Sequence, residues 1–210
     1  MTNFFNGFQP RFSVPEDKRI DTKQFLDAAS NIPAFFDLLS SAFKPVKSDV
    51  NGNVTKLRNR YLEDPEKFRT LNDLIDWELE LIHLKSPPKV SVIDALLWLK
   101  RGLQYISVLL GAIVKDHRDG RQSELMSEHA ASAYERTLKP HHNWMTQKLF
   151  QLCSKAVPYR RDFLKAACYG EEADVERTIG DMEAFLANLD SNLDVIAELY
   201  DSGNLHVHQR

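Results

Sequence analysis

The chain has 210 residues, a length that suits one hydrophobic core and is short for two ordinary domains. Hydrophobic residues make up 43% of the chain and charged residues 27%, proportions that exclude disorder as its main state. The 27 basic and 30 acidic residues give a net charge of -3, which provides no positive field for gathering phosphates. We therefore expect no nucleic-acid partner.

The sequence also argues against a membrane span and a disulfide framework. The longest nearly unbroken apolar run, residues 105–114, is about half as long as a helix that crosses a bilayer. The N-terminus lacks the basic and apolar regions of a signal peptide. Cys153 and Cys168 have no C-x-x-C spacing, so we expect two reduced, buried thiols in a cytoplasmic protein.

Apolar residues recur at spacings of three and four, which predicts helices along the whole chain. A first helix is expected over residues 22–39, capped by Asp21 and bent at Pro33. A second is expected over residues 48–60, although it contains Gly52. Further helices are expected over residues 70–84, 91–114, 124–138 and 141–156, a short one after residue 161, and a last one over residues 174–200.

These elements predict an all-α protein of about eight helices. The segment 91–114 leaves little polar circumference, so we expect it at the centre of the fold. Pro140 suits the start of the helix that follows it. Internal repeats and heptads are absent from the sequence, so we expect one domain over residues 1–210 and a monomer.

Three polar residues follow the same face of the second predicted helix. Asp49, Asn53 and Lys56 stand at i, i+4 and i+7, which aligns an acceptor, an amide and a donor. Such a row can bind the vicinal hydroxyls of a sugar. The same spacing is also common on solvated helix faces, so the spacing alone leaves both interpretations open.

Trp98 and His142 are two further candidates. The indole of Trp98 is a suitable platform for the apolar face of a sugar, although a tryptophan among leucines is often a core residue. His142 follows Pro140 near an expected helix start, where open backbone N–H groups and an imidazole can reach a polar group. Because His141 and His142 point in different directions on a helix, we expect no metal site and no cofactor.

Several sequence blocks, in their order along the chain, resemble the glycolipid transfer protein family. The resemblance covers residues 15–200 and implies a two-layer helical sandwich with one bound glycosphingolipid, its headgroup at the surface and its ceramide chains in an apolar tunnel. The blocks are FFD at 35–37, FKPVKSD at 43–49, GNVTKL at 52–57, LWLKRGL at 97–103, HNW at 142–144 and PYRRDFLK at 158–165.

The resemblance also implies roles for the candidate residues. Asp49, Asn53 and Lys56 would hydrogen-bond the sugar, and Trp98 would stack under its first ring. Asp49 and His142 would hold the ceramide amide, which a glycerolipid lacks. A ceramide-1-phosphate carrier, the alternative cargo class in this family, has arginine in place of the tryptophan, so Trp98 favours a neutral sugar.

We expect other residues to contact the lipid chains or a membrane. Trp144 suits the bilayer interface, and Lys89, Arg160 and Arg161 could touch headgroups. The nearly neutral net charge predicts transient membrane association. The apolar tunnel is expected at Phe35, Phe36, Phe43, Leu138, Phe150, Val157, Phe163 and Phe185.

Both ends of the chain depart from the family. Residues 1–14 have no counterpart, and we expect the phenylalanines of this extension to pack on the core, with a membrane contact as the alternative. The closing tyrosine of the animal type is missing from the C-terminal tail at 204–210. His206 and His208 alone would make a poor metal site.

Two other functions compete with lipid transfer. A lipid sensor could present its cargo to an endoplasmic-reticulum receptor through the Phe35-Phe36 pair, although this pair also fits an ordinary amphipathic helix. An enzyme could use His142 and Asp49 as an acid and a base, but neither a nucleophile motif nor a phosphate loop accompanies them. We therefore expect a binding protein and no catalysis.

Overall fold

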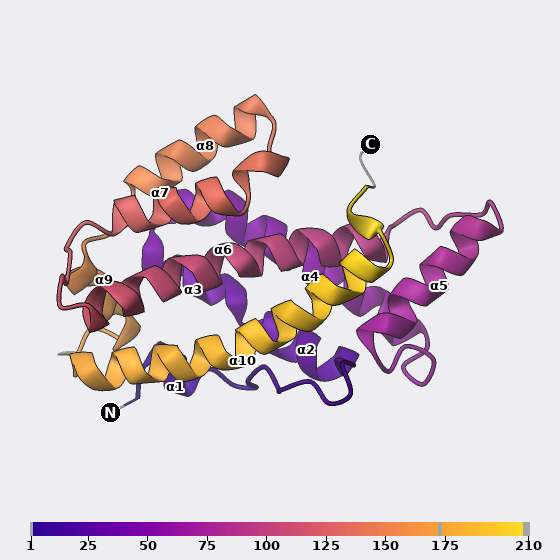
Figure 1. Cartoon of the computed structure of the whole chain (residues 1–210), viewed down its shortest axis with the longest axis horizontal. Helices are drawn as coiled ribbons and strands as arrows, with labels where there is room; N and C mark the ends of the chain where they lie inside the picture. The colour runs from indigo at the N-terminus through magenta and orange to yellow at the C-terminus, as the bar shows by residue number, and fades with distance from the viewer. Residues whose placement is uncertain (1, 172–173, 208–210) are drawn as a thin grey trace.

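A computed structural model describes residues 2–171 and 174–207, and this part of the chain is helical and contains no β-strand (Figure 1). The all-helical prediction is confirmed. The α-helices are α1 (Phe4–Gly7), α2 (Thr22–Ala29), α3 (Ile32–Leu39), α4 (Lys44–Glu63), α5 (Leu71–His83), α6 (Val92–Arg118), α7 (Met126–Arg136), α8 (Trp144–Lys155), α9 (Arg160–Ala167) and α10 (Val175–Ser202). Short 3-10 turns are η1 (Ser41–Phe43), η2 (Lys139–His141) and η3 (Leu205–Val207).

The helices form two layers around a shared core, as predicted. In Figure 1 the indigo and purple helices α1 to α4 lie behind α6, α7 and α10. Helix α6 packs on α4 and on α10, while α7 packs on both α6 and α8. The central position expected for the most apolar segment is therefore confirmed.

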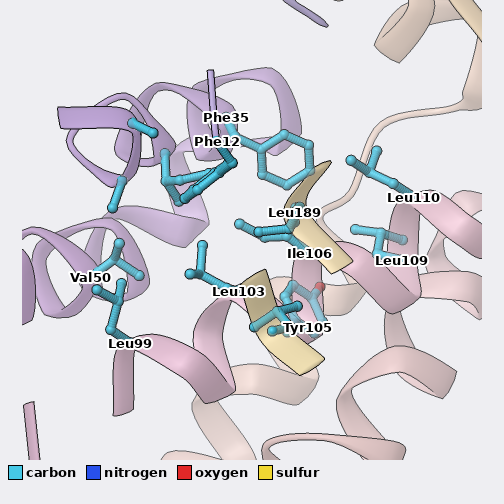
Figure 2. Close-up of a cluster of buried hydrophobic side chains, with 14 of the residues drawn as sticks. Phe12, Phe35, Val50, Leu99, Leu103, Tyr105, Ile106, Leu109, Leu110 and Leu189 are labelled. Atoms are coloured by element: carbon cyan, nitrogen blue, oxygen red, sulfur yellow. The ribbon is translucent and has the colours of Figure 1, made fainter. Parts of the chain in front are cut away.

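Helix α6 is long and apolar enough to cross a membrane by those two measures alone, but 61% of its most apolar window is buried. Figure 2 shows Leu103, Ile106 and Leu110 of α6 in one cluster with Phe35 and Leu189 from other helices. The apolar character of α6 therefore reflects its place in the protein core.

The first predicted helix is in fact two helices, and the expected bend at Pro33 is wrong. Helix α2 ends where the Ser30 hydroxyl donates to the Leu26 carbonyl at 2.7 Å. Pro33 lies in the first turn of α3, where its missing N–H removes no helical hydrogen bond. The proline therefore begins a helix here.

The beginning of α8 also differs from the prediction. Asn143 caps this helix by accepting a hydrogen bond from the Thr146 N–H at 3.0 Å, so α8 starts at Trp144. Pro140 belongs to η2, which precedes the helix. His142 consequently projects from a connecting turn, where its orientation is not tied to the period of a helix.

Two shifted boundaries have clear local causes. Helix α4 begins at Lys44 because Pro45 occupies its first turn. Helix α6 continues to Arg118, beyond the predicted end at 114, because the buried Asp116 in its last turn finds partners in the loop that follows. The Asp116 carboxylate accepts hydrogen bonds from the Arg121 guanidinium at 3.0 Å and the Ser123 N–H at 2.6 Å.

The N-terminal extension packs on the core, as expected. Phe4, Phe5, Phe8 and Phe12 are between 2% and 8% exposed, which excludes them from membrane contact in this conformation. Both cysteines are likewise free and buried, as predicted.

A buried carboxylate fixes the start of α6. Glu78 of α5 is 3% exposed and accepts hydrogen bonds from the N–H groups of Val92 at 2.6 Å and Ile93 at 2.9 Å. These two groups lack partners inside the helix, and the negative charge suits the positive end of the helix dipole. Glu78 therefore joins α5 to the helix that carries Trp98.

Glu78→Ala should lower the free energy of unfolding by about 1.5–3 kcal/mol, because two buried N–H groups lose a charged partner. Urea denaturation followed by circular dichroism measures this change. Glu80→Ala is a matched control, because Glu80 lies on the same helix and is exposed. Equal stabilities for the two variants would contradict a capping role for Glu78.

Candidate headgroup site

A pocket of about 340 Å³ opens among α4, α6, α8 and the turn before α8. Its polar lining residues are Asp49, His141, His142, Asn143 and Thr146. Its apolar lining includes Val46, Val50, Trp98, Leu138 and Phe150. The fold thus brings together Asp49, Trp98 and His142, three candidates that lie far apart in the sequence.

The three polar residues predicted on α4 form a hydrogen-bonded row. The Asn53 amide donates to the Asp49 carboxylate at 3.3 Å, and the Lys56 ammonium donates to the Asn53 carbonyl at 3.1 Å. Asn53 is only 2% exposed, whereas Asp49 and Lys56 are exposed. Of the three residues only Asp49 lines the pocket, and the row runs from it along α4 to the exposed Lys56.

Asp49 lines the pocket, and its carboxyl is partly enclosed there although the residue as a whole stays exposed. Burial raises the pKa of this carboxyl above its usual value, and the Lys56 ammonium partly opposes the shift. A carboxylate that has lost part of its hydration is a strong acceptor for a ligand N–H or O–H.

The indole of Trp98 is half-buried and contacts the side chains of His142 and Arg101. The His142 ring stacks on it with ring centres 5.7 Å apart and an interplanar angle of 20°. The guanidinium of Arg101 lies 4.8 Å from the indole centre. These contacts hold the indole in one orientation, and a stacked ligand would exchange with one of them.

His142 is held by a tyrosine that the sequence analysis did not single out. The Tyr134 hydroxyl lies 3.1 Å from His142 Nδ1, and the Tyr134 ring stacks on Phe150 at 4.4 Å. Burial raises the pKa of Tyr134 to about 12, so its hydroxyl keeps its proton. Helix α7 gave no polar pattern that could have identified this residue.

Burial, together with nearby His141 and Arg101, lowers the pKa of His142 to about 4. The ring is therefore neutral at physiological pH, with one nitrogen as donor and the other as acceptor. When Tyr134 donates to Nδ1, the proton of the ring resides on Nε2.

An NMR titration of the His142 ring should give a midpoint of about 4, well below the ordinary value of 6.5. The unfolded chain takes up this proton first, so His142 should contribute less stability as pH falls from 6.5 toward 4. Unfolding of the wild type and of His142→Gln at several pH values measures that difference. A midpoint near 6.5 would contradict the burial of this ring.

The predicted membrane contacts divide into two groups. Trp144, at 71% exposure, and the charged side chains of Lys89 and Arg161 reach the surface. Arg160 does not, and its expected contact with headgroups is wrong. It is 7% exposed, and its guanidinium lies 2.9 Å from His117 Nδ1. This contact joins α9 to α6 and keeps the arginine side chain away from the surface.

The predicted tunnel residues also divide. Leu138 and Phe150 line the pocket, while Val157 is partly buried against the core. The remaining rings are enclosed within the core, at Phe35, Phe36, Phe43, Phe163 and Phe185. The helical reading of Phe35-Phe36 is confirmed by α3, and their 1% exposure contradicts their use as a receptor-docking pair in this conformation.

The C-terminal tail folds back against the end of α10. Leu205 is 5% exposed, and the His206 ring bonds to the Asp201 carboxylate at 2.6 Å.

Burial, with smaller effects of Arg101, Lys100 and His206, lowers the pKa of His141 in the pocket lining. His208 lies outside the described residues.

The sequence profile described as Glycolipid transfer protein (GLTP) matches residues 20–169. The chain belongs to the glycolipid transfer protein family. It is 42% identical to the glycolipid transfer protein of Danio rerio over 192 residues, which are 91% of each chain. The glycolipid transfer protein of the fungus Aureobasidium melanogenum is 36% identical over 189 residues, with 89% of this chain and 88% of the relative covered.

A solved structure of the GLTP-fold of FAPP2, which selects simple glycosphingolipids, matches with a TM-score of 0.81. It is 28% identical and covers 99% of both chains. The glycolipid transfer protein fold, predicted from the sequence blocks, is therefore confirmed.

Proposed function

We propose that this protein binds one glycosphingolipid and transfers it between membranes without chemical change. The observation that carries the proposal is the pocket where Asp49, Trp98 and His142 meet beside an apolar wall. Membership of the glycolipid transfer protein family supports the same function. The whole chain, residues 1–210, would act as one domain with an N-terminal extension.

The sugar headgroup would bind along the polar row and on the indole. Asp49 and Lys56 offer a carboxylate and an ammonium to neighbouring hydroxyls, and the enclosed Asn53 amide would reach the sugar by exchanging its hydrogen bonds within the row. The apolar face of the first sugar would stack on Trp98. The cation–π contact of Arg101 with an accessible indole is worth only about 0.5–1 kcal/mol, so its exchange for a sugar costs little.

The ceramide amide would bind between Asp49 and His142. The Asp49 carboxylate accepts from the amide N–H, and Nε2–H of a neutral His142 donates to the amide carbonyl. A glycerolipid lacks this N–H, and each polar group left unpaired in the pocket would cost about 1–3 kcal/mol. This pairing would select sphingoid lipids over phosphatidylcholine.

Asp49→Val and Trp98→Ala should each reduce glycolipid transfer by roughly 10- to 100-fold, because each removes about 1.5–3 kcal/mol of binding. The measurement is transfer of labelled galactosylceramide between vesicles, with ceramide-1-phosphate and phosphatidylcholine as competing cargoes. Far-UV circular dichroism should stay unchanged.

Trp98→Phe is the matched control for the indole, because it keeps an aromatic platform and should retain part of the activity. Full transfer by a folded Asp49→Val or Trp98→Ala protein would remove that residue from the site. Equal transfer of all three lipids by the wild type would contradict a headgroup-selective function. Preferential transfer of ceramide-1-phosphate would favour the phosphate cargo.

An apolar surface on α8 would dock the protein on a bilayer. Trp144, Met145 and Leu152 are between 65% and 73% exposed, and Leu149 joins them at the pocket lining. Exposed apolar side chains on one helix favour a membrane or protein contact, and tryptophan suits the lipid interface. Docking here would place the pocket mouth near the membrane, and Lys89 and Arg161 could add weak contacts with headgroups.

The double variant Trp144→Ala/Leu152→Ala should lower vesicle association and transfer together, by about 10-fold or more, because two anchoring side chains are lost. Co-sedimentation with phosphatidylcholine vesicles measures the association. Leu62→Ala is the control, since Leu62 is 61% exposed on α4. If both proteins bind vesicles equally, α8 is not the docking surface.

We place the protein in the cytoplasm as a monomer that visits membranes transiently.

A sensing role remains the second candidate function, because the same pocket could present a bound glycolipid to a partner. Mass spectrometry of lipid recovered intact after incubation distinguishes binding from catalysis. Transfer that is too slow to redistribute vesicle lipids, together with tight binding, would favour sensing.

A further inference from the structure

A continuous row of phenylalanine rings extends from the pocket into the core. Phe150, which lines the pocket, lies 6.4 Å from Phe43, and Phe43 stacks on Phe36 at 5.9 Å between ring centres. The row continues from Phe36 to Phe35 at 5.7 Å and from Phe35 to Phe4 at 6.2 Å. Aromatic packing holds these rings together, so they can separate without breaking a hydrogen bond.

Residues 3–13, here called the N-terminal aromatic segment, form the inner end of this row. Phe4 contacts Phe8 at 5.8 Å, and Phe8 contacts Phe185 of α10 at 5.0 Å. Figure 2 shows Phe12 in the same buried cluster as Phe35. A cavity of about 40 Å³ remains beside Phe12 and Phe185, so packing here is not complete.

Side-chain hydrogen bonds fasten the N-terminal aromatic segment to its surroundings. Asn3 and Asn6 each donate to the same Asp181 carboxylate oxygen on α10, both at 2.8 Å. Farther along, the Ser13 carbonyl accepts from the Asn192 amide at 2.6 Å. Most of the segment thus lies outside regular helix, and the packing of its rings and a few polar contacts together hold it in place.

We propose that the N-terminal aromatic segment is the end wall of the lipid-chain compartment and sets the longest acyl chain that the protein carries. This inference rests on the proposed function. A pocket of about 340 Å³ is sized for one small ligand, so two long hydrocarbon chains need the space that the phenylalanine row fills. A chain that follows the row reaches Phe4 and Phe8 last.

Beyond that point each added methylene must push the N-terminal aromatic segment away from Phe185. Such a displacement exposes apolar surface and breaks the contacts with Asp181. The wild type should therefore carry short and medium acyl chains well and lose affinity for very long ones. Loosening the segment should extend the accepted length.

The test is vesicle transfer of galactosylceramide with octanoyl, palmitoyl or lignoceroyl chains. Asp181→Ala removes the shared acceptor of Asn3 and Asn6 without opening a cavity among the rings. The ratio of the lignoceroyl to the octanoyl rate should rise about 10-fold relative to the wild type. Phe8→Ala, which removes a ring from the wall itself, should raise the ratio in the same direction.

Lys18→Ala is the matched control. It breaks an exposed ion pair with Glu198 at 2.7 Å on the same N-terminal stretch and should keep the wild-type ratio. An unchanged ratio in a folded Asp181→Ala protein that still transfers the octanoyl lipid would overturn the proposal that this segment is the end wall. If Phe8→Ala fails to fold, the result for Asp181→Ala alone decides. A wild type that transfers no galactosylceramide of any length would instead overturn the proposed function.

Discussion

Helix α6 approaches α4 closely at Gly102, and this contact sets the spacing of the two helices that carry Trp98 and Asp49. A Cβ atom at Gly102 would lie 3.4 Å from the Val50 side chain, so a residue larger than alanine would push the two helices apart. Trp98 stands one turn before Gly102 on α6, and Asp49 precedes Val50 on α4. The distance between the Trp98 indole and the Asp49 carboxylate therefore depends on glycine at position 102, where a side chain would separate the two helices.

The site combines rigid and adjustable parts. Asp49, Asn53 and Lys56 are fixed by a single helix, and Trp98 by the helix that passes through the core. His142 comes from a turn, and its place depends on Tyr134 and on ring stacking with Trp98. A ligand that separates the two stacked rings would thus reorganise the turn before α8 while leaving the polar row on α4 in place.

Much of this arrangement could be predicted from the sequence, because the main helices follow strong apolar periodicity. The polar row on α4 also follows directly from residue spacing on a helix. The position of Arg160 could not be predicted, since an arginine near a helix start is ordinarily exposed and its buried partner, His117, comes from a distant helix. The sequence does not predict the break between α2 and α3, because a proline in an apolar run suits a bend as well as a new first turn.

One of the two buried cysteines, Cys153, can report on the opening of the protein core. Cys153 is fully enclosed near Tyr105, its thiol lies 3.2 Å from the Ala42 carbonyl, and burial raises its pKa. A protonated and inaccessible sulfur does not react with alkylating agents. The rate at which this sulfur is alkylated in the native protein would therefore report how often the core around Cys153 opens to solvent.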